Sequence, residues 1–373
     1  MSRIRVVELL LVELPLVRPF RTSFGEMREK RCIVVRVETD VAEGWGECVA
    51  DVRPDFSEEF NDGAWIVLRE FLAPALVGAD TTDVESAERS FAGVRGHPMA
   101  KAALLNAILD AELRADGTSL ASWLGADKAR VECGVSIGIA PSTEALLEQV
   151  EWFLAEGYRR IKLKIRPGTD LERVRAVRAA HPDILLSVDA NAAYTLADAD
   201  VFRSMDELGL LMIEQPLHHE DLLHHAELQA MLRTDLCLDE SIRSASAADA
   251  AIDLGACRVV NIKQGRVGGV LEARRIHDLC RERGVPVWCG GMLETGIGRA
   301  LNLALAAMPG FTLPGDTSAS ARYFEQDLTR PFELASDGTM AVPSEPGIGV
   351  TPLADRLRAC VSRREAVTAR SKE

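Results

Sequence analysis

The chain lacks most of the short signatures that reveal a protein's chemistry at first reading. Its eight cysteines never form a CxxC pair, and its 373 residues can bury a core without disulfides, so we expect reduced, mostly buried thiols. It has no Walker A sequence, and the GRVGG stretch at residues 265–269 does not have the spacing of a dinucleotide fingerprint. These absences argue against a disulfide-stabilised scaffold and against a bound nucleotide.

Clusters of basic residues and long apolar runs are missing as well. The 57 acidic residues outnumber the 43 basic ones, which are scattered, so neither nucleic acid nor an anionic membrane is an expected partner. No uninterrupted apolar segment reaches the length of a membrane span, and Glu8 and Glu13 interrupt the apolar N-terminal stretch. We expect a cytoplasmic homo-oligomer that acts on a small molecule.

Two patterns of secondary structure divide the chain. Residues 1–125 contain strand-like runs followed by helical segments, which predicts an α+β domain. Residues 126–321 alternate short apolar runs with amphipathic helical stretches, which predicts an α/β barrel of about eight parallel strands. Residues 322–360 lack this rhythm and are expected to return to the first domain, and residues 361–373 are expected to form a loose, charged tail.

Five of the expected barrel strands end in a chemically useful residue. These residues are Lys164, Asp189, Glu214, Asp239 and Lys263, at intervals of 25, 25, 25 and 24 residues. One interval corresponds to one strand and one helix. Because the C-terminal ends of the strands form the active-site face of such a barrel, the five side chains should converge.

Three neighbouring carboxylates without cysteine or histidine suit a hard cation such as Mg²⁺, for which Mn²⁺ or Co²⁺ can substitute. Asp189, Glu214 and Asp239 are therefore the predicted metal ligands. A single carboxylate at a strand end often caps the next helix, but three in register between two lysines argue against that explanation. Lys162 should share a strand face with Lys164, where it could lower the pKa of Lys164 or bind a substrate carboxylate.

A cation flanked by two lysines suits the removal of a proton beside a carboxylate. General base catalysis contributes only about 10²- to 10⁴-fold, so charge stabilisation by a divalent cation must supply the larger share. Two other interpretations are weaker. A non-catalytic metal-binding scaffold does not explain the two lysines, and the HHEDLLHH run at residues 218–225 is better explained as an exposed helix start than as a transition-metal site.

Several longer motifs occur in a fixed order along the chain. They are PFRTSFG, GWGEC, GHPMAKAA, KLK, DANAAY, IEQPL, LDES, NIKQGRVGG, CGGMLETGIGRA and LPGDTSAS. Together they resemble the enolase superfamily and, within its muconate-lactonising subgroup, the o-succinylbenzoate synthase and N-acylamino acid racemase family. The resemblance implies a (β/α)₇β barrel with an α+β capping domain, in which PFRTSFG is a lid loop.

The resemblance also implies roles for individual residues. Lys164 would be the principal acid/base, Lys263 the residue on the opposite face of the substrate, and the three carboxylates the Mg²⁺ ligands. The implied substrate-binding residues are Phe20, Phe24, Ser136, Lys162, Asn191, Gly291, Met292 and Leu293. Arg266 and Glu240 are expected to tune the site, Arg266 by lowering the pKa of Lys263.

The resemblance leaves two reactions open. The first is the Mg²⁺-dependent syn dehydration of 2-succinyl-6-hydroxy-2,4-cyclohexadiene-1-carboxylate to o-succinylbenzoate in menaquinone biosynthesis, which needs one base. The second is racemisation of N-acylamino acids, which needs an acid/base group on each face of the substrate. Both reactions pass through an enediolate, and one enzyme can carry both.

Overall fold

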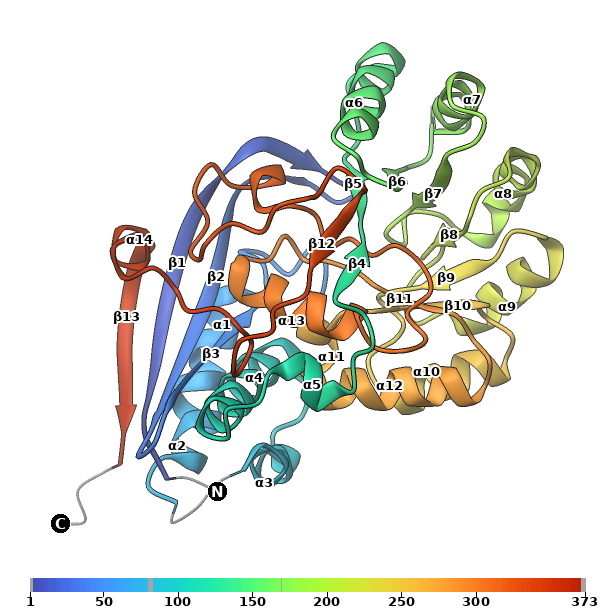
Figure 1. Cartoon of the computed structure of the whole chain (residues 1–373). Helices are drawn as coiled ribbons and strands as arrows, with labels where there is room; N and C mark the ends of the chain where they lie inside the picture. Colours follow the sequence, from blue (N-terminus) through green and yellow to red (C-terminus); the bar gives the residue numbers. More distant parts are fainter. Residues whose placement is uncertain (1–2, 80–82, 169, 370–373) are drawn as a thin grey trace.

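The computed structural model describes residues 3–79, 83–168 and 170–369. A four-stranded antiparallel sheet lies beside a barrel of parallel strands, and helices cover the outside of the barrel (Figure 1). The sheet has the strand order β13-β1-β2-β3. Its strands are β1 (Ile4–Arg21), β2 (Glu26–Thr39), β3 (Glu43–Cys48) and β13 (Val361–Thr368). This sheet and the helices packed on it are called the cap below.

The cap helices follow the sheet in sequence. They are α1 (Asn61–Val67), a π-helical turn (Leu68–Leu72), α2 (Ala73–Leu76), α3 (Val84–Ser90), α4 (Pro98–Ala115) and α5 (Leu120–Leu124). Helix α4 is rich in alanine and leucine, and it is buried around almost its whole circumference. Its backbone lies against β3, where a Cβ atom at Gly44 or Gly46 would come within 2.0 Å of an α4 carbonyl oxygen. The two glycines of the EGWGE segment thus permit this close packing.

The barrel follows with a regular alternation of strand and helix. Its strands are β5 (Gly134–Ile137), β6 (Arg160–Lys164), β7 (Leu185–Asp189), β8 (Ile213–Glu214), β9 (Leu236–Leu238), β10 (Val259–Ile262) and β11 (Val287–Cys289). Its helices are α6 (Thr143–Ala155), α7 (Asp170–Ala180), α8 (Ala199–Met205), α9 (Leu222–Met231), α10 (Ala245–Asp253), α11 (Gln264–Val267), α12 (Val270–Glu282) and α13 (Gly296–Ala306). All seven strands are parallel, and each lies next to its sequence neighbour.

An irregular segment closes the barrel where an eighth strand was expected. Residues 311–316 form bridges to both outer strands of the sheet, Phe311 to Val287 and Gly315 to Cys133. Gly134 N donates to Gly315 O over 2.7 Å, and Asp316 N donates to Cys289 O over 2.9 Å. Pro314 interrupts the segment and cannot donate a backbone hydrogen bond, which accounts for the missing regular strand. The expected (β/α)₇β barrel with its α+β cap is therefore confirmed.

The expectation of a loose tail from residue 361 is wrong for the described part of that segment. Residues Val361–Thr368 form β13, which pairs antiparallel with β1 from Val12 to Val6. An edge strand tolerates charged side chains on its solvent face, so the composition of VSRREAVT concealed a strand. Residues 370–373 lie outside the described residues.

The chain also returns to the cap before β13. Asp110 of α4 accepts a hydrogen bond from Ile348 N, and helix α14 (Ala354–Cys360) contacts β1. Strands β4 (Arg130–Glu132) and β12 (Thr339–Ala341) form a small antiparallel pair directly before the first barrel strand. We infer from the contacts of Ile348 and α14 that residues 322–360 complete the capping domain, while β12 lies against the barrel side.

Two expectations drawn from missing features can be compared with the structure. Across residues 3–79, 83–168 and 170–369, we find no helix both long and apolar enough to cross a membrane. All eight cysteines lie in the described residues, where each is buried and free of disulfide bonds.

Candidate active site

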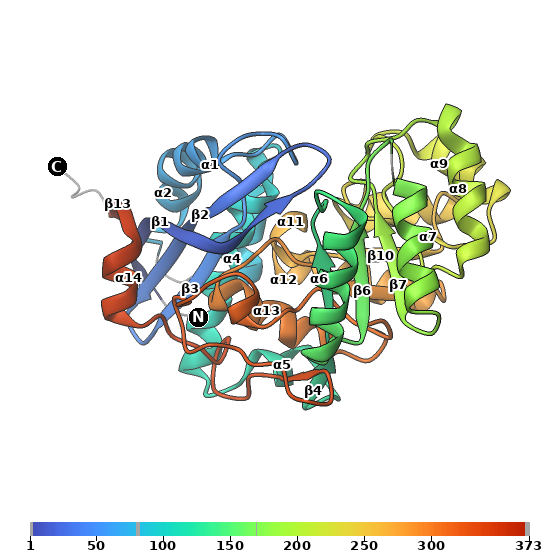
Figure 2. The same ribbon diagram turned by 90° about the horizontal axis from the view of Figure 1, so that it is seen from above.

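A pocket opens between the cap and the C-terminal ends of the barrel strands. Its volume is about 370 Å³, which suits a small organic ligand. Ten residues that the sequence analysis singled out line it: Phe20, Phe24, Ser136, Lys162, Lys164, Asn191, Lys263, Gly291, Met292 and Leu293. The hairpin of β1 and β2 carries the two phenylalanines and extends toward the barrel strands (Figure 2).

The five strand-end residues occupy adjacent positions around the barrel. Strands β6 to β10 are consecutive in the sheet, and the register pairs Lys164 with Asp189 and Asp189 with Glu214. Asp239 directly follows β9, and Lys263 directly follows β10. The order across five strands is therefore lysine, aspartate, glutamate, aspartate, lysine.

Each lysine binds a carboxylate of this row. Lys164 Nζ donates to Asp189 Oδ2 and to the side-chain oxygen of Asn191, each over 2.6 Å. Lys263 Nζ donates to Asp239 Oδ2 over 2.7 Å and lies 5.0 Å from the centre of the Phe56 ring. The two lysines thus stand at opposite ends of the row, and both face the pocket.

The three carboxylates are fully buried, and their charges interact. Burial raises the pKa of Asp189, but the ammonium groups of Lys164 and Lys162 outweigh it and the net pKa is lowered. Burial also raises the pKa of Asp239, and Lys263 and Arg266 reverse that effect. Glu214 is different, because burial and the charge of Asp189 together hold its pKa above the ordinary value. The middle of the row is therefore where a further positive charge is most favourable.

Arg160 and Asp316, two charged residues that were not predicted from the sequence, lie next to Lys162. Lys162 Nζ lies 2.7 Å from both Glu214 and Asp316, and Asp316 also binds Arg160 over 2.8 Å. Arg160 alternates with Lys162 and Lys164 on the same strand face, so the alternation that revealed the lysines could have revealed it. Asp316 ends the weaker run FTLPGD, where an eighth strand was expected, but its spacing falls outside the steps of about 25 residues that marked the other strand ends.

An indole ring forms the floor under these charges. Arg160 and Lys162 both lie over the ring of Trp288, at 4.9 and 4.7 Å from its centre. The indole nitrogen donates to the sulfur of Cys237. Although burial lowers the pKa of Lys162, Asp316 and Glu214 outweigh it and hold the pKa well above the ordinary value. The expected effect of Lys162 on the pKa of Lys164 stays a prediction.

The two expected tuning residues lie behind the pocket. Glu240 accepts a hydrogen bond from Asn191 over 2.9 Å, and Arg266 Nε lies 3.0 Å from Asp239 Oδ1. Burial lowers the pKa of Lys263, but Asp239 and Glu214 outweigh it and the net pKa is raised. Any influence of Arg266 on Lys263 therefore runs through the carboxylate of Asp239 that both cations contact.

The histidine-rich run lies apart from the row of carboxylates. His218, His219 and Glu220 place potential ligand atoms within 4.8 Å of one another on the loop before α9. His225 is buried, and its ring binds the backbone at Asp221 and Leu217, so the expectation of an exposed helix start is wrong at this residue. Two of these three residues are exposed and His219 is half-buried, and no second feature of the described loop indicates a metal site.

Two family descriptions match almost the whole chain. Residues 6–125 match the mandelate racemase / muconate lactonizing enzyme N-terminal domain, and residues 145–356 match the enolase C-terminal domain-like family. The chain belongs to this enzyme family. Its members are enolase superfamily enzymes, so the sequence resemblance is confirmed.

Relatives within this family carry two names. An N-succinylamino acid racemase from Amycolatopsis is 55% identical over 94% of this chain and 95% of its own length. An o-succinylbenzoate synthase from Geobacillus kaustophilus is 51% identical over 91% of this chain and 90% of its own length. Among solved structures, an enolase superfamily member from Listeria innocua superposes with a TM-score of 0.94, at 39% identity, and covers 99% of this chain and 100% of its own.

Enolase superfamily enzymes depend on a divalent metal, and the residues of this chain fit one. The three buried carboxylates offer oxygen ligands from adjacent strands, which hard cations prefer. In the described part of the chain, the buried Asp239 Oδ1 has no hydrogen-bond partner, because Arg266 approaches it without hydrogen-bond geometry. The identity of the cation belongs to the proposal that follows.

Proposed function

We propose that this chain is an o-succinylbenzoate synthase that also racemises N-succinylamino acids. The observation that supports this function best is the row of Lys164, Asp189, Glu214, Asp239 and Lys263 on five adjacent strands. The named relatives support the choice of substrates. The pathway that the resemblance implies is menaquinone biosynthesis, and the substrate in either reaction is a small carboxylate.

Mg²⁺ is the proposed cation, held by Asp189, Glu214 and Asp239. When bound, it stabilises the negative charge that develops on the substrate carboxylate as the α-proton leaves. Phe20 and Phe24 of the hairpin, with Met292 and Leu293, form apolar walls that exclude water from this charge.

In the dehydration, Lys164 removes the proton from the carbon that bears the carboxylate. The electron pair of that bond forms an enediolate and then expels the hydroxyl group from the neighbouring carbon. Lys164 returns the proton to the departing hydroxyl, so one water leaves and the ring becomes aromatic. Lys263 stays protonated and stabilises the enediolate by its charge.

In the racemisation, one lysine acts as the base and the other as the acid. One lysine removes the α-proton from one face of an N-succinylamino acid, and the other delivers a proton to the opposite face. The position of the lysines at opposite ends of the row favours this second reaction, because dehydration needs only one base.

Exchange of the α-proton in deuterated water tests the assignment. Wild-type protein with Mg²⁺ should exchange both enantiomers of an N-succinylamino acid and should dehydrate the cyclohexadiene substrate. The Lys263→Ala variant should lose exchange of one enantiomer, and Lys164→Ala should lose exchange of the other. Dehydration should collapse in Lys164→Ala and fall strongly in Lys263→Ala.

Two results would contradict the proposal. One is a wild-type protein that turns over neither substrate with any divalent cation, which favours a non-catalytic scaffold. The other is a single lysine variant that still exchanges both enantiomers at the wild-type rate, which means that the two lysines do not act on separate faces. Far-UV circular dichroism of each variant verifies that the fold is intact.

A further inference from the structure

A lysine of the cap is buried at the edge of the active site without belonging to the row. Lys30 lies on β2, its side chain is fully buried, and Nζ donates to the backbone oxygen of Met292 over 2.9 Å. Its nearest carboxylate, Asp51, is 3.9 Å away. Within the described residues, this buried ammonium therefore combines a distant ion pair with Asp51 and a hydrogen bond to a backbone turn of the barrel that lines the pocket.

A glutamate on the next cap strand binds the residues that follow Met292 in the same turn. Glu47 lies on β3, which pairs with β2, and it is also fully buried. Its carboxylate accepts from Thr295 N over 3.1 Å, from Thr295 Oγ1 over 2.7 Å and from Gly298 N over 3.0 Å. The cap thus fixes residues 292–298 with one positive and one negative side chain.

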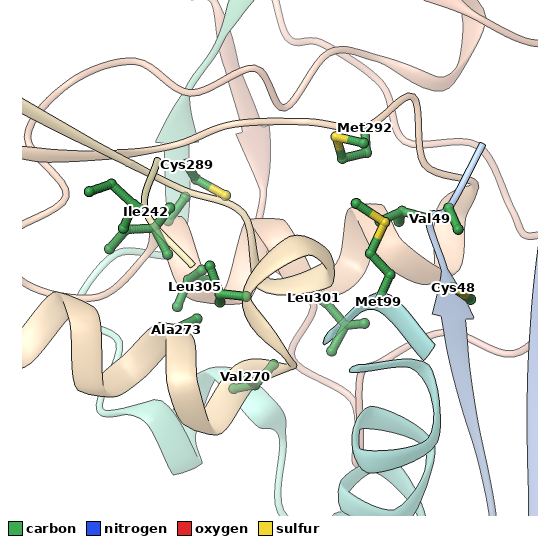
Figure 3. Close-up of a cluster of buried hydrophobic side chains, with 14 of the residues drawn as sticks. Cys48, Val49, Met99, Ile242, Val270, Ala273, Cys289, Met292, Leu301 and Leu305 are labelled. Carbon is green, nitrogen blue, oxygen red and sulfur yellow. The ribbon is translucent and has the colours of Figure 1, made fainter. Parts of the chain in front are cut away.

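The turn held in this way contacts Lys263. Lys263 Nζ lies 3.6 Å from the sulfur of Met292, and a Cβ atom at Gly290 would come within 2.7 Å of Lys263 Cε. Leu293 has a left-handed backbone with φ of +55°, a conformation that the surroundings of a non-glycine residue must enforce. The side chain of Met292 belongs to the same buried apolar cluster as Val49 and Met99 of the cap, and Figure 3 draws the three residues in one view. A shift of this turn therefore changes the room available to Lys263.

We propose that Lys30 is a positioning residue for Lys263, with Glu47 as its partner, so that the cap sets the geometry of one of the two bases. This inference rests on the proposed function. Charge compensation of the nearby carboxylates of Asp51 and Glu47 explains why an ammonium group is present here, but it does not require the hydrogen bond to Met292 O. That hydrogen bond fixes the Met292 turn beside Lys263.

The Lys30→Met variant tests the proposal, since methionine keeps the length of the side chain and removes the donor. Exchange of the enantiomer that depends on Lys263 should fall about 10- to 100-fold, because a misplacement of about 1 Å can have that effect. Exchange through Lys164 should change less than about threefold. The ratio of the two exchange rates is the readout, because general loosening of the fold lowers both rates.

Asp110→Asn is the matched control. Asp110 is another fully buried charge of the cap, and it accepts from Trp45 N and Ile348 N, away from the turn. The control should lower thermal stability and leave the ratio of exchange rates unchanged. If Lys30→Met fails to fold, Met292→Leu removes the sulfur contact with Lys263 and should shift the ratio in the same direction.

Equal losses through both lysines, or an unchanged ratio, in a folded Lys30→Met variant would overturn the inference. If that variant does not fold, an unchanged ratio in Met292→Leu would overturn it. Failure of the proposed function is distinguishable, because the wild-type protein would then exchange neither enantiomer. If the wild-type protein exchanges both enantiomers and the variants keep the same ratio of exchange rates, only the role of Lys30 is contradicted.

Discussion

The two lysines of the site stand in different surroundings. Lys164 is held by Asp189 and Asn191, which both belong to the barrel strand β7 and the residues after it. Lys263 is held by Asp239 of the barrel, but its other neighbours are Phe56 of the cap and Met292 in the turn that the cap fixes. Barrel residues hold Lys164, the first of the two proposed bases, whereas residues of barrel and cap together surround Lys263, the second.

Because of this difference, the two proposed reactions should depend on the cap to different degrees. Dehydration requires one correctly placed base, and the barrel supplies it without help from the cap. Racemisation requires a second base at a matching distance on the other face, and that distance depends on how the cap sits on the barrel. Changes in the cap should therefore alter racemisation more than dehydration.

The largest effect on activity should come from replacing Glu214, which lies in the middle of the row, between the strands that carry Lys164 and Lys263. Glu214→Ala should reduce both reactions at least about 10³-fold, because it removes a proposed ligand of the cation that would stabilise the enediolate. Steady-state rates with saturating Mg²⁺ measure the loss, and chelation of wild-type protein should give the same loss reversibly. Full activity of this variant would refute the metal assignment.

The second largest effect should come from replacing Arg266, and it should be confined to the reaction that needs Lys263 as a base. Arg266 and Lys263 share the carboxylate of Asp239, so removing Arg266 leaves Asp239 free to bind the lysine more tightly. Arg266→Gln should lower kcat/KM for racemisation about 10- to 100-fold and for dehydration less than fivefold. The measurement is the ratio of the two kcat/KM values in one preparation, and equal losses would contradict the tuning role.

A smaller effect should appear on the Lys164 side. Asn191 has φ of +43°, so Asn191→Gly removes the side-chain acceptor without adding backbone strain. Exchange of the enantiomer that depends on Lys164 should fall about fivefold, and exchange through Lys263 should stay within twofold. Asn191→Ala adds the strain and serves as the comparison. A loss on both sides would show that the two surroundings are coupled.

The smallest effect on activity should come from a cap residue that touches neither lysine. Glu59 caps the start of α4, and burial raises its pKa to about 7. Between its ordinary pKa and about pH 7, the folded protein holds a proton that the unfolded chain releases, so stability falls as the pH rises through this window. The loss should reach about 3 kcal/mol.

Urea unfolding at a series of pH values between 4.5 and 7.5 measures this slope. Glu59→Gln cannot titrate, so the contribution of Glu59 to the slope should vanish while exchange through both lysines stays within twofold. An identical slope in wild-type and variant protein would show that another group is responsible.

The local sequence pattern was sufficient to predict which barrel residues lie in the site. The alternation of Lys162 and Lys164 and the steps of about 25 residues place five side chains, because each depends only on strand direction and repeat length. Asp316 was not found in this way, since it lies 53 residues after Lys263, outside the steps of about 25 residues, and Pro314 breaks the weak strand pattern of FTLPGD. Strand β13 was hidden because an exposed edge strand can be as charged as a loop.

The contacts that the cap makes with the site could not be predicted from local sequence patterns, for a different reason. Lys30 contacts a residue 262 positions away, and Glu47 contacts one 248 positions away. Only the packing of the cap on the barrel brings these groups together, and no spacing in the sequence encodes that packing. The half of the site that depends on the cap therefore became visible only in three dimensions.

The indole of Trp288 gives the protein an optical reporter of its own chemistry. Lys162 lies over this ring and is paired at the same time with Glu214 and Asp316. A cation held by Glu214 would compete with Lys162 for that carboxylate, which would change the electric field across the indole. Tryptophan emission should then follow cation loading in unlabelled protein, and Trp288→Phe identifies the share of the signal that comes from the barrel interior.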